Sequence, residues 1–271
     1  GVTNSFPENV PGAFPVHTPD KIVVKDFENW QDYVHAPSLK FSDELWNICK
    51  DMYAAVDGTK AYKAAFVAPG IFEQVHHLCS MQEALMNYME YPDEMHDLIK
   101  YLTDWELELA EGICSNLHPD AILHHDDWGS QRDPFFSDSI ARELFLPHMQ
   151  KFVSHIHEKG RYCGIHSCGH VADRVPVFID AGIDTWQMQA NANAADIDRL
   201  YDTLGDKIVF QISIPEFDLT DDRAAVEAAR NYVDRYCQPG KPTMLIGRDA
   251  LTSRVFAEEV YEYSRKHYLN L

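Results

Sequence analysis

The second half of the chain repeats one short pattern, and this repetition limits the folds that the chain can adopt. An amphipathic helical segment ends at a glycine, and a short β-branched or aromatic run follows, at Gly160, Gly182 and Gly205. Glycine is the residue that most easily takes the left-handed conformation at a helix end. Helices that alternate with strands in this way join neighbouring strands of a parallel sheet.

The first half of the chain follows the same alternation less regularly. The whole sequence predicts six parallel strands, at 64–68, 120–125, 162–167, 185–188, 207–213 and 243–247. The predicted helices include 72–78, one that Ser80 caps, one from Pro92 to about Asn116, one from Ser137 to Lys159 with a kink at Pro147, and a closing helix capped by Thr252 or Ser253. The run KIVVK (21–25) is predicted to be a peripheral strand or a hairpin arm.

Six strands leave two α/β architectures open. One is a doubly wound sheet, and the other is a (β/α)8 TIM-type barrel that lacks its first strands in the given sequence. Polar residues follow nearly every predicted strand, which favours the barrel because barrel enzymes place their chemistry there. We therefore expect 1–271 to form a single (β/α) barrel domain, with 1–60 as an irregular or helical N-terminal part. The sheet edges of such a barrel would need further residues or a second chain to cover them.

Composition excludes several classes of partner. Acidic residues outnumber basic ones by 43 to 23, and the resulting net charge of -20 disfavours binding to nucleic acid or to anionic membranes. No apolar run is long enough to cross a bilayer, and the start of the chain lacks a signal-peptide pattern. The 6 cysteines are sparse and form no C-x-x-C pair, so a reducing cytoplasm is expected. The expected partner is a small-molecule substrate.

The densest polar cluster is HHDDWGSQ (124–131), directly after a predicted strand. Adjacent residues at a strand end point to opposite sides, so only one of Asp126 and Asp127 should face the barrel mouth as the catalytic carboxylate. His125 and Gln131 are candidates for substrate binding. The alternative is that one aspartate caps a turn and that the histidines only form structural hydrogen bonds.

A second cluster, HSCGH (166–170), also follows a predicted strand. His166 is a candidate catalytic residue, and His166 with Cys168 could bind Zn²⁺ if a third ligand came from another loop. The alternative is a packed Cys168 and a His166 that donates a hydrogen bond to substrate.

Further strand-end side chains complete the set of candidates. Glutamines at successive strand ends suit an uncharged polar ligand, but they could equally connect the loops to each other. The further residues expected to bind substrate are the glutamines Gln187, Gln189 and Gln211, together with Arg248. Glu73 shares a predicted helix face with His76 or His77.

Several of these segments resemble the uroporphyrinogen decarboxylase superfamily, which includes corrinoid-linked coenzyme M methyltransferases. The similar segments are DDWGSQ (126–131), the helix at 137–160, IHSCGHV (165–171), DAGIDTWQMQ (180–189) and LGDKIVFQ (204–211). The resemblance implies a (β/α)8 barrel in which 64–68 corresponds to the third strand. It also implies that homodimers are common.

The resemblance leaves three functions open. The methyltransferase branch binds zinc through His-x-Cys and a later cysteine. His166 and Cys168 match the first part, but 245–247 holds no cysteine and Cys237 comes too early. A methyltransferase of corrinoid-linked one-carbon metabolism, with the corrinoid on a partner protein, is the leading hypothesis. The alternatives are a tetrapyrrole decarboxylase without cofactor, whose arginines would lie on strands not seen here, and a catalytically silent barrel that acts as a binding subunit.

Overall fold

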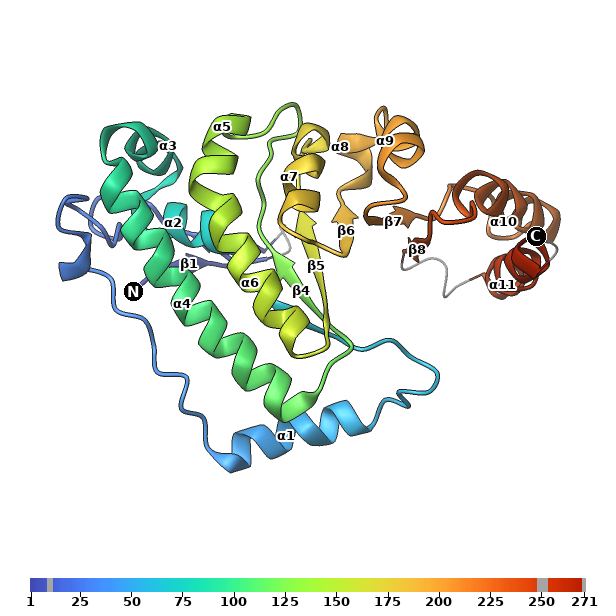
Figure 1. The fold of residues 1–271 in the computed structure, drawn as a ribbon, viewed down its shortest axis with the longest axis horizontal. Coiled ribbons are helices and arrows are strands. Elements are labelled where there is room, and N and C mark those ends of the chain that lie inside the picture. Colours follow the sequence, from blue (N-terminus) through green and yellow to red (C-terminus); the bar gives the residue numbers. More distant parts are fainter. Residues whose placement is uncertain (9–11, 248–252, 270–271) are drawn as a thin grey trace.

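The computed structural model describes residues 1–8, 12–247 and 253–269. Its centre is one parallel sheet whose six strands follow chain order (Figure 1). The strands are β3 (Ala64–Val67), β4 (Ala121–His125), β5 (Tyr162–Ser167), β6 (Thr185–Met188), β7 (Val209–Ser213) and β8 (Thr243–Ile246). All six predicted strands are present. This is the α/β architecture of a TIM-type barrel, with β3 and β8 at the two edges of the described sheet.

Helices connect the strands and cover one face of the sheet, as right-handed crossovers require. In Figure 1, α4 and α6 run side by side across this face, and α10 and α11 lie together beyond β8. The main helices are α1 (Asp43–Ala54), α2 (Ile71–Cys79), α3 (Met81–Glu90), α4 (Pro92–Leu117), α6 (Leu146–Glu158), α7 (Val175–Asp180), α9 (Ile197–Leu204), α10 (Asp222–Tyr236) and α11 (Arg254–Leu269). Ser80 caps α3 as predicted, since its Oγ accepts a hydrogen bond from the Glu83 backbone N–H.

The register of the strands separates two rows of side chains on opposite faces of the sheet. The row that faces the helices is buried and consists of Val67, His124, Ile165, Trp186 and Phe210. The opposite face carries a polar row at the carboxyl ends of four strands, which consists of His125, His166, Gln187 and Gln211. In a barrel this second face lines the interior, and the predicted site residues lie on it.

The long helix after β4 confirms its predicted start and contains one irregular turn ahead of Pro147. Ser137 accepts a hydrogen bond from the Ile140 backbone N–H, and the helix continues from α5 (Asp138–Ile140) into α6. Between them lies a wider π-helical turn, η2 (Ala141–Phe145). Pro147 has no N–H to donate to the preceding turn, and the wider turn accommodates that missing bond.

The prediction that KIVVK forms a strand is wrong. The backbone N–H groups of Val23 and Val24 both donate to the Leu78 carbonyl, at 3.0 Å each, near the end of α2. A β-branched run can pair with the edge of any sheet, but here the hydrogen-bond acceptor is a carbonyl near the end of a helix. The strand pair of this region is instead β1 (Asn4–Ser5) with β2 (Phe14–Pro15), which are antiparallel.

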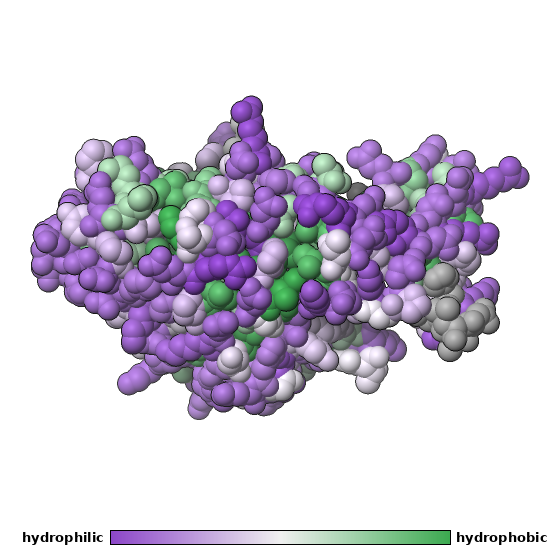
Figure 2. Space-filling model, turned by 45° about the horizontal axis from the view of Figure 1, so that its top comes forward, coloured by the Kyte–Doolittle hydropathy of each residue, from purple (hydrophilic) through white to green (hydrophobic). Residues whose placement is uncertain are grey.

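The surface is dominated by polar residues. Figure 2 shows a mainly hydrophilic face with apolar residues gathered near its middle. Among the described residues, no helix combines the length and the apolar character that a membrane span requires. Ser253 caps α11 through the Phe256 backbone N–H at 3.2 Å. Thr252 lies outside the described residues.

Candidate functional site

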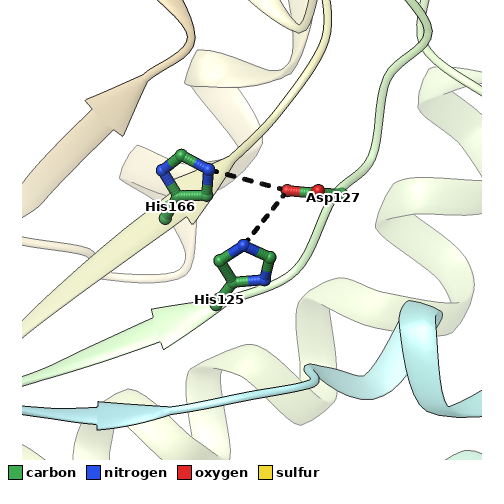
Figure 3. A group of neighbouring side chains, drawn as sticks. All are labelled: His125, Asp127 and His166. Atoms are coloured by element: carbon green, nitrogen blue, oxygen red, sulfur yellow. Dashed lines mark ion pairs between the residues drawn. The ribbon is translucent and has the colours of Figure 1, made fainter. Parts of the chain in front are cut away.

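Three side chains from two neighbouring strand ends point at one another (Figure 3). His125 ends β4, Asp127 follows in the next loop, and His166 lies on β5 directly beside His125. The Asp127 Oδ1 atom is 3.7 Å from His125 Nε2 and 3.8 Å from His166 Nε2. The two imidazole rings stack nearly parallel, with centroids 4.7 Å apart. The parallel register therefore brings these predicted residues to one point.

His125 is held by a carboxylate on the far side of its ring. Its Nδ1 atom is 2.8 Å from Glu73 Oε2, and Phe66 packs edge-on against the ring. Burial lowers the pKa of His125, but the bond to Glu73 and the charge of Asp127 outweigh burial and raise it above its usual value. A hydrogen bond from Nδ1–H to Glu73 leaves Nε2 directed at Asp127.

His166 lies in a different electrostatic environment from its stacked neighbour. Burial and the adjacent His125 lower the pKa of His166, while Asp127 and the Gln187 amide oppose this. Its Nε2 atom is 3.2 Å from Cys168 Sγ. The ring is therefore expected to be neutral at neutral pH and able to accept a proton or a ligand.

Asp127 and Cys168 link the loops after β4 and β5. The Cys168 backbone N–H donates to Asp127 Oδ1 at 2.6 Å. Burial, together with Asp127, raises the pKa of the Cys168 thiol to about 12. The predicted pair of His166 and Cys168 is thus close enough to share a ligand, with Asp127 beside both.

The neighbouring carboxylate, Asp126, points away from this group into the protein. It is 2% exposed and accepts hydrogen bonds from the backbone N–H groups of Phe72 and Glu73 and from Trp128 Nε1. Burial and nearby Glu73 raise the pKa of Asp126 to about 7, although the N–H donors favour its charged form. Asp126 therefore caps α2 from across the sheet, and it orients the helix that carries Glu73.

Two glycines allow the backbone around this site to pack closely. A Cβ atom on Gly70 would lie 2.4 Å from Asp126 Cβ, so only glycine lets α2 approach that carboxylate. A Cβ atom on Gly169 would lie 2.0 Å from the Gly129 carbonyl oxygen, and Gly169 also has a φ of +81°. The loops after β4 and β5 are therefore in direct backbone contact.

The predicted glutamines bond mainly to one another. Gln131 and Gln189 exchange two amide hydrogen bonds, at 3.0 and 3.1 Å, and Gln189 also accepts from the Gly169 backbone N–H. Gln187 donates to Gln211 at 3.2 Å, so both line the same row as the two histidines. The first pair thus connects loops, and the second lies beside the two histidines on the same face of the sheet. Arg248 lies outside the described residues.

A buried acid behind the site was missed by the sequence reasoning. Glu106 on α4 is 1% exposed, lies 3.0 Å from His124 Nε2 and accepts from Gln74 Nε2 at 2.7 Å. Burial lowers the pKa of His124, but Glu106 outweighs burial and raises it. The signal was available, because Glu106 interrupts an apolar stripe at i+4 spacing formed by Leu98, Leu102 and Ala110.

Glu73 was predicted to share a helix face with His76 or His77, and of these three residues Glu73 hydrogen-bonds to His125. His76 packs against Phe72, with centroids 5.1 Å apart, and burial lowers its pKa to about 3. The His77 carbonyl oxygen lies 3.3 Å from His17 Nε2.

Comparison with known proteins identifies the family of this chain and supports its fold. The family model for uroporphyrinogen decarboxylase (URO-D) matches residues 8–238, which is more than half of the chain. The chain belongs to the uroporphyrinogen decarboxylase family. No curated protein sequence matches it significantly. A methyltransferase from Methanosarcina mazei has a similar structure, with a TM-score of 0.68 and 14% identity, covering 99% of this chain and 76% of that one.

These findings confirm the resemblance predicted from the sequence and the barrel-type fold. The candidate site of this URO-D family member lies at the carboxyl ends of its strands, where barrel enzymes carry out their chemistry. At 14% identity, the likeness to the methyltransferase extends to the fold alone.

Proposed function

We propose that this URO-D family member is a methyltransferase of corrinoid-linked one-carbon metabolism. The observation that carries the proposal is the convergence of His125, Asp127, His166 and Cys168 at two adjacent strand ends. The fold of a solved methyltransferase supports it. The methyl group would move between a small-molecule acceptor and a corrinoid on a partner protein.

The side chains are proposed to have different roles in methyl transfer, which follow from their surroundings. In transfer to a thiol, the acceptor loses its proton, its sulfur forms a bond to the methyl carbon, and the cobalt–carbon bond breaks with the electron pair left on cobalt. His166 is proposed to bind the acceptor or an ion that holds it, because its ring is the neutral one of the two and offers a lone pair, and the thiol proton passes to solvent. Asp127 orients His125 and His166 from between them. Gln187 and Gln211, which hydrogen-bond to each other, lie in the same row as the two histidines.

Two other functions compete with this one. Decarboxylation of a tetrapyrrole would need cationic groups to hold carboxylates, and the described residues of the polar row include no Arg or Lys. A binding subunit without activity is favoured by one observation, the glutamine pairs that satisfy each other. Both alternatives predict a chain that does not transfer methyl groups.

The test is demethylation of methylcobalamin by the purified chain with simple thiols as acceptors. We expect cobalt to be reduced from its methylated form at a rate that the His166→Ala variant lowers about 100-fold or more. His157→Ala is a matched control, because His157 pairs with Asp184 away from the site. Absence of turnover with every thiol, or an unchanged rate in His166→Ala, would contradict the proposal.

We also propose a reducing compartment for the chain and a partner that covers the edges of its sheet. Five cysteines, Cys49, Cys79, Cys114, Cys163 and Cys168, form no disulfide within the described part of the chain, which suits the reducing cytoplasm. The edges of β3 and β8 have no neighbouring strand among the described residues. A second copy of the chain, or further residues, remains the predicted partner of these edges.

A further inference from the structure

Asp127 lies between His125 and His166 without a hydrogen bond to either ring. The ligand atoms of all three lie within 4.8 Å of one another, and it is the one such group of three among the described residues. The Asp127 Oδ1 atom is 3.7 and 3.8 Å from the two Nε2 atoms. These distances are too long for hydrogen bonds, although the atoms point at each other.

The same distances fit a shared ion. Two ligand atoms on one tetrahedral Zn²⁺, each bonded at about 2.0–2.1 Å, lie about 3.3 Å apart. The two separations from Asp127 exceed that by less than 1 Å, and all three ligand atoms lie within 4.8 Å of one another, so rotation of the side chains would bring them to one ion. We propose that His125 Nε2, Asp127 Oδ1 and His166 Nε2 bind one divalent transition-metal ion, a ligand set distinct from the predicted pair of His166 and Cys168.

The groups behind the ligands support this assignment independently. A metal-binding histidine usually donates its second N–H to a carboxylate, which fixes the tautomer and the ring orientation. Glu73 accepts in this way at His125 Nδ1, at 2.8 Å, and leaves Nε2 free for the ion. Asp126 in turn holds Glu73 through the cap of α2. The second shell of His125 is therefore already in place, whereas the buried His166 Nδ1 atom has no hydrogen-bond partner among the described residues.

The donor chemistry selects the class of ion. Two imidazoles and one carboxylate bind Zn²⁺ in hydrolases and Fe²⁺ in non-haem sites, with coordination positions left open. Cys168 Sγ lies 3.2 Å from His166 Nε2 but falls outside the group of three, so the site does not depend on a thiolate. When bound, the ion would supply a Lewis acid for an acceptor thiol. The role of the ion rests on the proposed function. The experiment below measures metal binding alone and does not depend on that function.

The experiment measures metal binding by the full chain without any activity assay. Chelator-treated protein is titrated with Co²⁺, whose absorption reports thiolate ligands through a charge-transfer band, and Zn²⁺ is then added in competition. We expect one ion per chain, a raised Tm and no thiolate band. His125→Ala and Asp127→Asn should lower the affinity by about 100-fold or more, and Glu73→Gln by about 10- to 100-fold.

Two variants separate this site from its rivals. Cys168→Ser should bind within about 3-fold of the unaltered chain. His157→Ala, at a His–Asp pair remote from the group, should bind equally well. If His125→Ala does not fold, the metal affinities of Glu73→Gln and Cys168→Ser still distinguish the two ligand sets.

The outcomes also distinguish this inference from the proposed function. Stoichiometric binding without methyl transfer would support the metal site and count against the function. Methyl transfer by metal-free chain would keep the function and overturn the metal site. A strong thiolate band, or binding that Cys168→Ser abolishes and His125→Ala does not, would also overturn it.

Discussion

Replacement of Asp126 separates its proposed capping role from a catalytic one. Asp126 is 2% exposed, and its carboxylate accepts three N–H groups, two from α2 and one from Trp128. Asp126→Ala leaves these donors buried without an acceptor, and each unsatisfied donor costs about 1–3 kcal/mol. Because some water will reach the gap, we expect a total loss of about 3–5 kcal/mol.

The adjacent residue provides the matched comparison. Asp127 accepts a single backbone N–H, from Cys168, and its side chain is 28% exposed. We expect Asp127→Ala to cost less than about 1.5 kcal/mol in unfolding free energy while activity is lost. Urea denaturation followed by circular dichroism measures both variants. A loss below about 1 kcal/mol in Asp126→Ala would refute the capping argument.

Three further results are expected. Gly169→Ala should cost more than about 2 kcal/mol, because its Cβ would clash with the Gly129 carbonyl at positive φ. Gly160→Ala, whose φ is +68° in open space, should cost only about 1 kcal/mol; equal losses in thermal denaturation would contradict the packing. The raised pKa of His124 gives stability that is complete below its ordinary value of 6.5 and is lost as pH rises through the higher folded-state pKa. Glu106→Gln should remove that decline above pH 6.5 in denaturation midpoints, and an unchanged decline would assign it to other groups.

The order of strands and the position of the site could be predicted because they follow from local patterns. Each strand run is short and bounded by a helix and glycine, and parallel strands deliver their ends to one rim. The proximity of Asp127 to His166 follows from that rule alone. The alternation of side chains also predicted that Asp126 and Asp127 would diverge.

The remaining features depend on contacts between distant segments. Nothing near Asp126 in the sequence indicates that it would cap a helix that begins at Ile71. The link of Glu73 to His125 requires the same approach of α2, which Gly70 permits. KIVVK was misassigned because strand propensity does not identify the partner, and here the partner is the Leu78 carbonyl.

Anomalous diffraction from crystals grown with Zn²⁺ tests the central claim most directly. The account predicts one strong peak at the zinc edge, within about 2.2 Å of His125 Nε2, Asp127 Oδ1 and His166 Nε2. A peak bonded to Cys168 and distant from His125, or no peak between the two stacked rings, would contradict it.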